Sequence, residues 1–161
     1  MHVGSLSGIY RYPVKSMAGE QLTTSEIGQG GLPGDRAWAV RDEVRGGIRG
    51  AKKIPALMQL SARYLVQPGA GCSTSAEITL PGGVRVNTGD DGINALLSAA
   101  LDHKVSLWPL VSPGLLDHYR RGAPDNEDLE QELRDVFVPA LGVLCERMLG
   151  RMLRIDCDLR A

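Results

Sequence analysis

The first half of the chain alternates apolar and polar residues in short stretches that are separated by turns. Alternation with a period of two is typical of half-buried strands. The alternating stretches are residues 9–14, 21–27, 36–41, 62–66, 77–80 and 84–87. Six or seven short strands with frequent turns indicate a barrel or a sandwich.

The pattern changes near residue 90. Asp91 is a suitable helix cap, and four apolar residues at helical spacing follow it, so we expect a helix near residues 91–101. The four residues are Ile93, Leu96, Leu97 and Ala100. Residues 105–110 alternate again and predict one further strand.

The C-terminal part predicts helices. Its acidic residues between 125 and 132 favour a helix start, because the helix dipole stabilises negative charge there. Apolar residues then recur every three or four positions up to residue 155, and Pro139 divides the run into two helices near residue 138. The predicted fold class is therefore α+β: a small β-barrel of about six or seven strands, a helix near 91–101 and C-terminal helices.

Composition narrows the function classes. A chain of 161 residues suffices for one core, and 20 glycines with 9 prolines favour a β-rich fold over a helical bundle. The net charge of −1 gives no general attraction to nucleic acid or to an anionic membrane, so any anion site must be local. No stretch approaches the length of a membrane span, and three unpaired cysteines fit a reducing compartment, so we expect a cytoplasmic protein.

Two short segments carry candidate chemistry. Lys15 and Ser16 follow the first strand where it leaves the sheet, and an ammonium, a hydroxyl and free backbone N–H groups suit an anion such as phosphate. Arg36 ends a glycine-rich corner at residues 28–34, and a guanidinium grips phosphate by two parallel hydrogen bonds. The alternatives are a solvated lysine at a strand end and a surface ion pair of Arg36 with Asp35 or with a glutamate.

Other site classes lack their sequence signals. No helix is predicted after the glycine-rich corner, which argues against a dinucleotide loop. The three histidines, His2, His103 and His118, are far apart and show no metal-ligand spacing. No serine or cysteine stands in a nucleophile motif, so we assign neither catalytic residues nor metal ligands.

Several motifs, in order and spacing, resemble one family. The runs at residues 12–16 (Tyr-Pro-Val-Lys-Ser) and 31–38 (Gly-Leu-Pro-Gly-Asp-Arg-Ala-Trp) resemble the N-terminal β-barrel domain of MOSC proteins. These proteins include the mitochondrial amidoxime-reducing component and its bacterial relatives. Residues 93–107 and 117–122 are also similar to bacterial members, so the resemblance covers roughly residues 3–137.

The resemblance implies a role for the two candidate segments. In the family this barrel is paired with a second domain, the MOSC domain, and molybdenum cofactor binds between them. The family's lysine and serine of the first motif and arginine of the second help to hold the cofactor's phosphate, and they match Lys15, Ser16 and Arg36. Molybdopterin is therefore a possible ligand by resemblance, and the expected domains are a barrel at 1–137 and a divergent helical tail at 138–161.

The chain also departs from the family. We expect no MOSC domain in these 161 residues: that domain carries the molybdenum-ligating cysteine, and neither Cys145 nor Cys157 lies in a similar motif. We therefore expect a binding module that is not an enzyme on its own. The alternatives are an assembly protein with a vestigial anion site, dimerising through its tail, and a subunit completed by a separate MOSC-domain chain. The expected oligomerisation residues are Leu141, Leu144, Met148 and Met152.

Overall fold

The computed structural model describes residues 4–28, 30–69, 74–111, 114–120, 122–124, 128 and 130–131. The chain divides after Gly122 into two units. In the second unit, Asp128 Oδ1 accepts hydrogen bonds from the backbone N–H groups of Glu130 (2.9 Å) and Gln131 (3.2 Å), the geometry of a helix N-cap. The predicted C-terminal helices beyond residue 131, and the four expected oligomerisation residues with them, lie outside the described residues.

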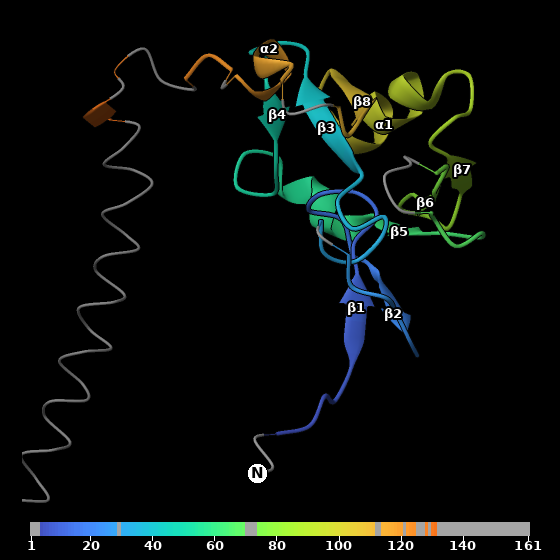
Figure 1. Cartoon of the computed structure of the whole chain (residues 1–161). Helices are drawn as coiled ribbons and strands as arrows, with labels where there is room; N and C mark the ends of the chain where they lie inside the picture. Colours follow the sequence, from blue (N-terminus) through green and yellow to red (C-terminus); the bar gives the residue numbers. More distant parts are fainter. Residues whose placement is uncertain are drawn as a thin grey trace, which may run out of the picture. The chain divides into compact units, whose positions relative to one another are not determined.

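The first unit, Met1–Gly122, combines short strands with few helices (Figure 1). Its described residues form eight antiparallel strands in three small sheets, which confirms a mixed, β-rich class. The sheets have the orders β1-β2, β4-β3-β8 and β5-β6-β7. The strands are β1 (Ile9–Arg11), β2 (Glu20–Leu22), β3 (Trp38–Asp42), β4 (Ile48–Arg49), β5 (Ser61–Arg63), β6 (Glu77–Thr79), β7 (Arg85–Asn87) and β8 (Val105–Pro109). The helices are η1 (Pro55–Gln59), α1 (Ile93–Leu101) and α2 (Leu116–Tyr119).

Most of these elements were predictable from the pattern of side chains, and two were not. α1 lies within the range expected for a helix, and its buried residues Ile93, Leu97 and Leu101 recur every four positions. β4 has only two residues, too few for an alternation to show, and α2 has four. This is why eight strands are found where six or seven were expected.

The segment between β1 and β2 links the three sheets. Single parallel bridges join Val14 to Trp38 of β3 and Ala18 to Ser61 of β5. Ala18 also donates its N–H to the Leu60 carbonyl and accepts from the Ala62 N–H, at 2.9 and 2.8 Å. The expected closed barrel is not found among the described residues, because single bridges, not continuous ladders, connect the sheets.

The core lies where the sheets, η1 and α1 meet. Its fully buried members are aliphatic, and burying each such side chain contributes roughly 1.5–3 kcal/mol. They include Val14, Val40, Leu57, Ile78 and Leu97. Val14 belongs to this core, so the chain immediately before Lys15 is anchored. No helix within the described residues is both long enough and apolar enough to cross a membrane.

A buried arginine ties the first hairpin to the glycine-rich corner. Arg11 is 1% exposed, and its Nε and Nη2 donate to Glu20 Oε1 at 2.9 and 2.7 Å. Nη1 donates to the Pro33 carbonyl (3.1 Å) and to Gln67 Oε1 (3.0 Å), and the guanidinium lies 4.7 Å from the centre of the Tyr64 ring. A buried charge is tolerated only when it is paired and hydrogen-bonded, and these contacts meet that condition.

Tyr64 extends the same network to Gly34. Its hydroxyl donates to the Gly34 carbonyl at 3.0 Å, and burial raises the pKa of Tyr64 to about 12. Gly34 has a φ of +79°, and a Cβ there would approach Pro68 Cγ to 2.5 Å. Only glycine suits this position, so the corner that leads into Arg36 is held on both sides.

A second network surrounds a buried carboxylate at the end of β3. Asp42 Oδ1 accepts the backbone N–H groups of Val44 (2.8 Å) and Arg45 (2.9 Å), and His103 Nε2 lies 3.1 Å away. Arg49 Nε lies 3.5 Å from Oδ2. Burial raises the pKa of Asp42. The two backbone N–H groups and His103 together lower it by more than burial raises it, so the pKa of Asp42 lies below its usual value.

We expect Arg11→Ala to lower the free energy of unfolding by about 3–5 kcal/mol, because it leaves Glu20 without its buried partner. Urea unfolding of the full chain measures the loss. The matched control is Arg63→Ala, whose ion pair with Glu77 involves an arginine side chain that is 49% exposed, and its cost is about 1 kcal/mol or less. Equal losses for the two variants would contradict the role given to Arg11.

We expect the Asp42 carboxylate to make the fold sensitive to acid. The pKa of Asp42 is lower in the folded than in the unfolded chain, so its stabilisation is complete above about pH 4 and declines as the pH falls through the folded pKa. Thermal unfolding between pH 6 and pH 3 should show a smaller loss of Tm for Asp42→Asn than for the wild type. The exposed Asp91→Asn should follow the wild type, and an unchanged acid dependence in Asp42→Asn would be the contrary result.

Candidate functional site

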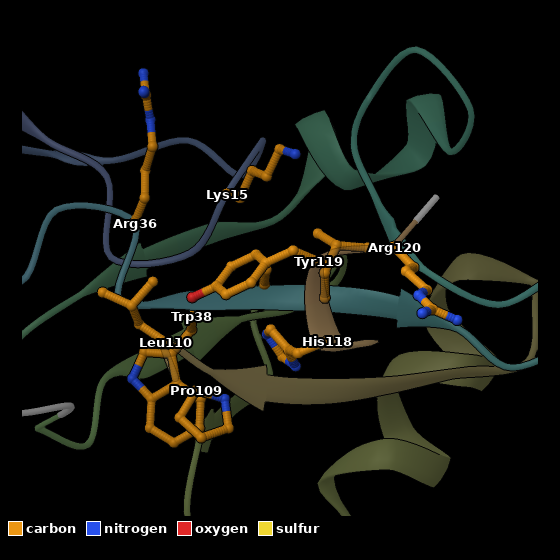
Figure 2. Close-up of a pocket in the computed structure, with 10 residues that line it drawn as sticks. Lys15, Arg36, Trp38, Pro109, Leu110, His118, Tyr119 and Arg120 are labelled. Atoms are coloured by element: carbon orange, nitrogen blue, oxygen red, sulfur yellow. The ribbon is translucent and has the colours of Figure 1, made fainter. Parts of the chain in front are cut away.

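A cavity of about 370 Å³ lies at the N-terminal end of β3, the end that follows the glycine-rich corner. Lys15, Arg36 and Arg120 contribute its positive charges (Figure 2). Trp38 and Ala39 of β3, Ile48 of β4 and the residues at the end of β8 give it an apolar lining. The cavity therefore joins an apolar surface to a cationic rim.

Backbone hydrogen bonds bring Lys15 and Arg36 to the same rim. The Arg36 N–H donates to the Tyr12 carbonyl at 2.7 Å, and the Trp38 N–H donates to the Pro13 carbonyl at 3.1 Å. The Lys15 N–H returns a bond to the Trp38 carbonyl at 2.9 Å. Both candidate motifs therefore lie side by side, and the two cations line one cavity.

The Arg36 side chain is only loosely engaged by its neighbour Asp35. Arg36 Nε lies 3.8 Å from Asp35 Oδ2, and the arginine side chain is 70% exposed. Asp35 Oδ1 accepts the Tyr12 N–H at 2.8 Å, so this carboxylate also holds the loop. An exposed ion pair of this length is worth little, so Asp35 does not prevent Arg36 from meeting an anion.

Ser16 lies beside the cavity rather than in its lining. Its backbone is left-handed, with a φ of +69°, which a serine adopts only at some cost in strain. A Cβ at Gly50 would lie 2.9 Å from Ser16 Oγ and 3.6 Å from Lys15 Cε, so the glycine after β4 leaves room for both side chains. The structure thus brings Lys15 and Arg36 to the cavity and leaves Ser16 at its margin.

No role was predicted for the residues that close the cavity from the C-terminal side, although residues 117–122 resemble bacterial members of the family. His118, Tyr119 and Arg120 line it, and they come from α2 and the residue that follows it. The glycines at 46, 47 and 122 were a usable signal, because a Cβ at Gly122 would overlap the Gly46 carbonyl and Gly47 has a φ of +77°. Such close backbone contact requires glycine on both segments.

The charges of the cavity favour an anion. None of the described residues that line it is acidic, although the whole chain has a net charge of −1. Lys15, Arg36 and Arg120 therefore give the cavity a local positive charge, although Lys15 and Arg36 are exposed, so salt screens their attraction for an anion. No group of three or more His, Cys, Asp or Glu side chains within the described residues is placed to hold a metal ion.

Comparison with known proteins identifies the family of the part of the chain that carries Lys15 and Arg36. The family model described as the MOSC N-terminal beta barrel domain matches residues 3–104. The matched range includes Lys15, Ser16 and Arg36 and ends before α2. No curated protein matches the chain.

Proposed function

Because the chain belongs to the family of the MOSC N-terminal beta barrel domain, we propose that it is a non-catalytic module that binds an anionic small molecule. The leading candidate for this ligand is a pterin phosphate. Lys15 and Arg36 supply the charge that attracts the phosphate, and Ser16 adds a hydroxyl at the margin of the site. Lys15 and Arg36 carry the proposal, because they stand in separate motifs and yet line one cavity.

The site suits the phosphate end of molybdenum cofactor. A lysine offers a point charge and an arginine offers a planar fork, and together they complement the tetrahedral oxygens of a phosphate. The apolar lining beside them suits an attached organic ring. The proposal of binding without catalysis rests on the sequence, in which neither Cys145 nor Cys157 resembles the metal-ligand motif.

The same premise extends to architecture and location. The proposal treats the three sheets, with the bridges at Val14 and Ala18, as the barrel that the family description names. It assigns residues 1–137 to this barrel domain and residues 138–161 to a helical tail. It places the protein in the cytoplasm, where three unpaired cysteines stay reduced.

Inorganic phosphate and a pterin phosphate should raise the Tm of the full chain, because a ligand that binds only the folded state stabilises it. At a hundredfold excess over Kd the gain is about 2.7 kcal/mol, which corresponds to about 5–10 °C. Lys15→Ala should remove most of the rise. Lys104→Ala is the matched control, because Lys104 is exposed and lies outside the cavity lining. A wild type that neither ligand stabilises would refute the proposal.

Exposed leucines beside the cavity favour a second candidate function, that of an assembly protein. Leu110 lines the cavity and is 61% exposed, and Leu115 and Leu116, at the start of α2, are 58% and 70% exposed. Apolar side chains that lie exposed in one patch are typical of contact sites. In this candidate the anion site is vestigial, and the leucines are covered by the tail of a second copy. A separate MOSC-domain chain is the other partner to consider. The tail residues concerned are Leu141, Leu144, Met148 and Met152.

The assembly candidate expects a homodimer at high micromolar concentration, measured by sedimentation equilibrium. Leu116→Asp and Leu144→Asp should each shift it towards monomer, because a buried carboxylate opposes an apolar interface. Leu65→Asp is the control, because Leu65 is 63% exposed and belongs neither to the cavity lining nor to α2. A monomeric wild type would count against this candidate.

A further inference from the structure

His118 gives the cavity a charge that can change near neutral pH. It lies in α2 and lines the cavity beside Tyr119 and Arg120 (Figure 2). Histidine is the residue type that gains or loses a proton between about pH 5 and pH 8, whereas lysine and arginine stay charged over this range. Among the described residues that line the cavity, His118 is therefore the one whose charge varies with pH in this range.

Aromatic neighbours fix the position of the His118 ring. Its centroid lies 5.2 Å from that of the Trp108 ring of β8 and 4.9 Å from that of the Tyr119 ring, which it meets edge-on. The Tyr119 hydroxyl in turn donates to the Val111 carbonyl at 2.5 Å. The His118 ring is therefore held at the cavity by its packing against other rings.

The His118 ring offers no acceptor for a proton at Nδ1. This nitrogen is buried and has no hydrogen-bond partner in the part of the chain that the structure describes. If the ring becomes positively charged, both of its nitrogens carry N–H groups, and the N–H at Nδ1 then lacks an acceptor. A partly buried charge without a partner is unfavourable. A positive ring is therefore favoured when a negative charge comes close to it.

The charged groups around the ring do not supply that negative charge. Asp117 also lies in α2, but its side chain is 87% exposed and its Oδ1 lies 3.0 Å from Arg120 Nε. On the side of β3, the Arg41 guanidinium lies 5.0 Å from the centre of the Trp108 ring, and Glu43 Oε1 lies 3.6 Å from Arg41 Nε. The charged and titratable groups that face the ring are Asp117, Tyr119 and Arg120 of α2, Arg41 of β3, and Lys15 and Arg36 at the rim of the cavity.

We propose that His118 is a proton-dependent part of the anion site, so that the protein binds an anion and a proton together. The positive ring adds its charge to those of Lys15 and Arg36, and the anion supplies the counter-charge that the protonated ring lacks. Because coupling between two ligands is reciprocal, the proton raises the affinity for the anion, and the anion favours the proton. The affinity for an anion therefore rises as the pH falls from about 8 to about 6. The inference rests on the proposed anion site and adds its regulation by pH.

Sulfate is the probe that separates the titration of the ring from that of the ligand. It has the tetrahedral shape and the double negative charge of a phosphate dianion, and it keeps that charge throughout the neutral range. Phosphate groups take up a proton themselves near about pH 6, which weakens their attraction to cations. A dependence on pH that is measured with sulfate therefore comes from the protein.

The test is isothermal titration of the full chain with sulfate at about pH 6 and about pH 8, at constant ionic strength, in two buffers that differ in their enthalpy of ionisation. The wild type should bind sulfate at least about fivefold more tightly at the lower pH, and the difference between the buffers should show net proton uptake. His118→Gln should bind sulfate equally at both pH values and without proton uptake. His103→Gln, the same change at a histidine outside the cavity lining, is the control and should behave like the wild type.

The outcomes separate this inference from the proposed function. If sulfate binds and Lys15→Ala abolishes its binding, but the affinity is the same at both pH values and no proton is taken up, only the present inference is wrong. A pH dependence that persists in His118→Gln, or that disappears in His103→Gln, overturns it too. If neither sulfate nor inorganic phosphate binds the wild type at either pH, the proposed anion site itself is wrong, and the inference with it. Proton uptake is measured on the wild type, so the coupling is tested even if a variant does not fold.

Discussion

The buried guanidinium of Arg11 is the interaction on which the candidate site depends. It joins β1 to Glu20 of β2, to the Pro33 carbonyl in the glycine-rich corner and to Gln67 after β5. A buried charge must have its hydrogen bonds satisfied, so all of these segments are held in one arrangement. Arg36 lies two residues after the corner. The hydrogen bonds of Arg11 fix the backbone of the corner, and this backbone sets the position of Arg36 relative to Lys15.

The two candidate motifs meet through backbone hydrogen bonds and through one bond from the Tyr12 N–H to the Asp35 carboxylate. The hydrogen bonds from Arg36 to Tyr12 and between Trp38 and the segment 13–15 fix the register of one motif against the other. The cations themselves remain exposed, with Arg36 in only a long contact to Asp35. The backbone that carries the two cations is already fixed, so only their side chains have to be ordered when an anion binds.

The sequence predicted what has a local cause and missed what depends on distant contacts. The apolar residues Ile93, Leu96, Leu97 and Ala100 predicted α1, because a helix buries every third or fourth residue. In the structure the buried residues of α1 are Ile93, Leu97 and Leu101. Lys15 and Arg36 were expected from their chemistry and from the family resemblance, and the structure places both at one cavity. The place of residues 118–120 in the cavity lining was not predicted, because α2 is too short to show a period. The role of Arg11 was missed as well, since its partners lie up to 56 positions away.

The claim that Lys15 and Arg36 hold one anion together is tested most directly by a double-mutant cycle on phosphate binding. Titration of inorganic phosphate into the wild type, Lys15→Ala, Arg36→Ala and the double variant gives the coupling between the two residues. Two cations that contact the same anion should each weaken binding when removed, with a coupling of more than about 0.5 kcal/mol. Additive losses, or loss on removing only one of them, would contradict a shared site.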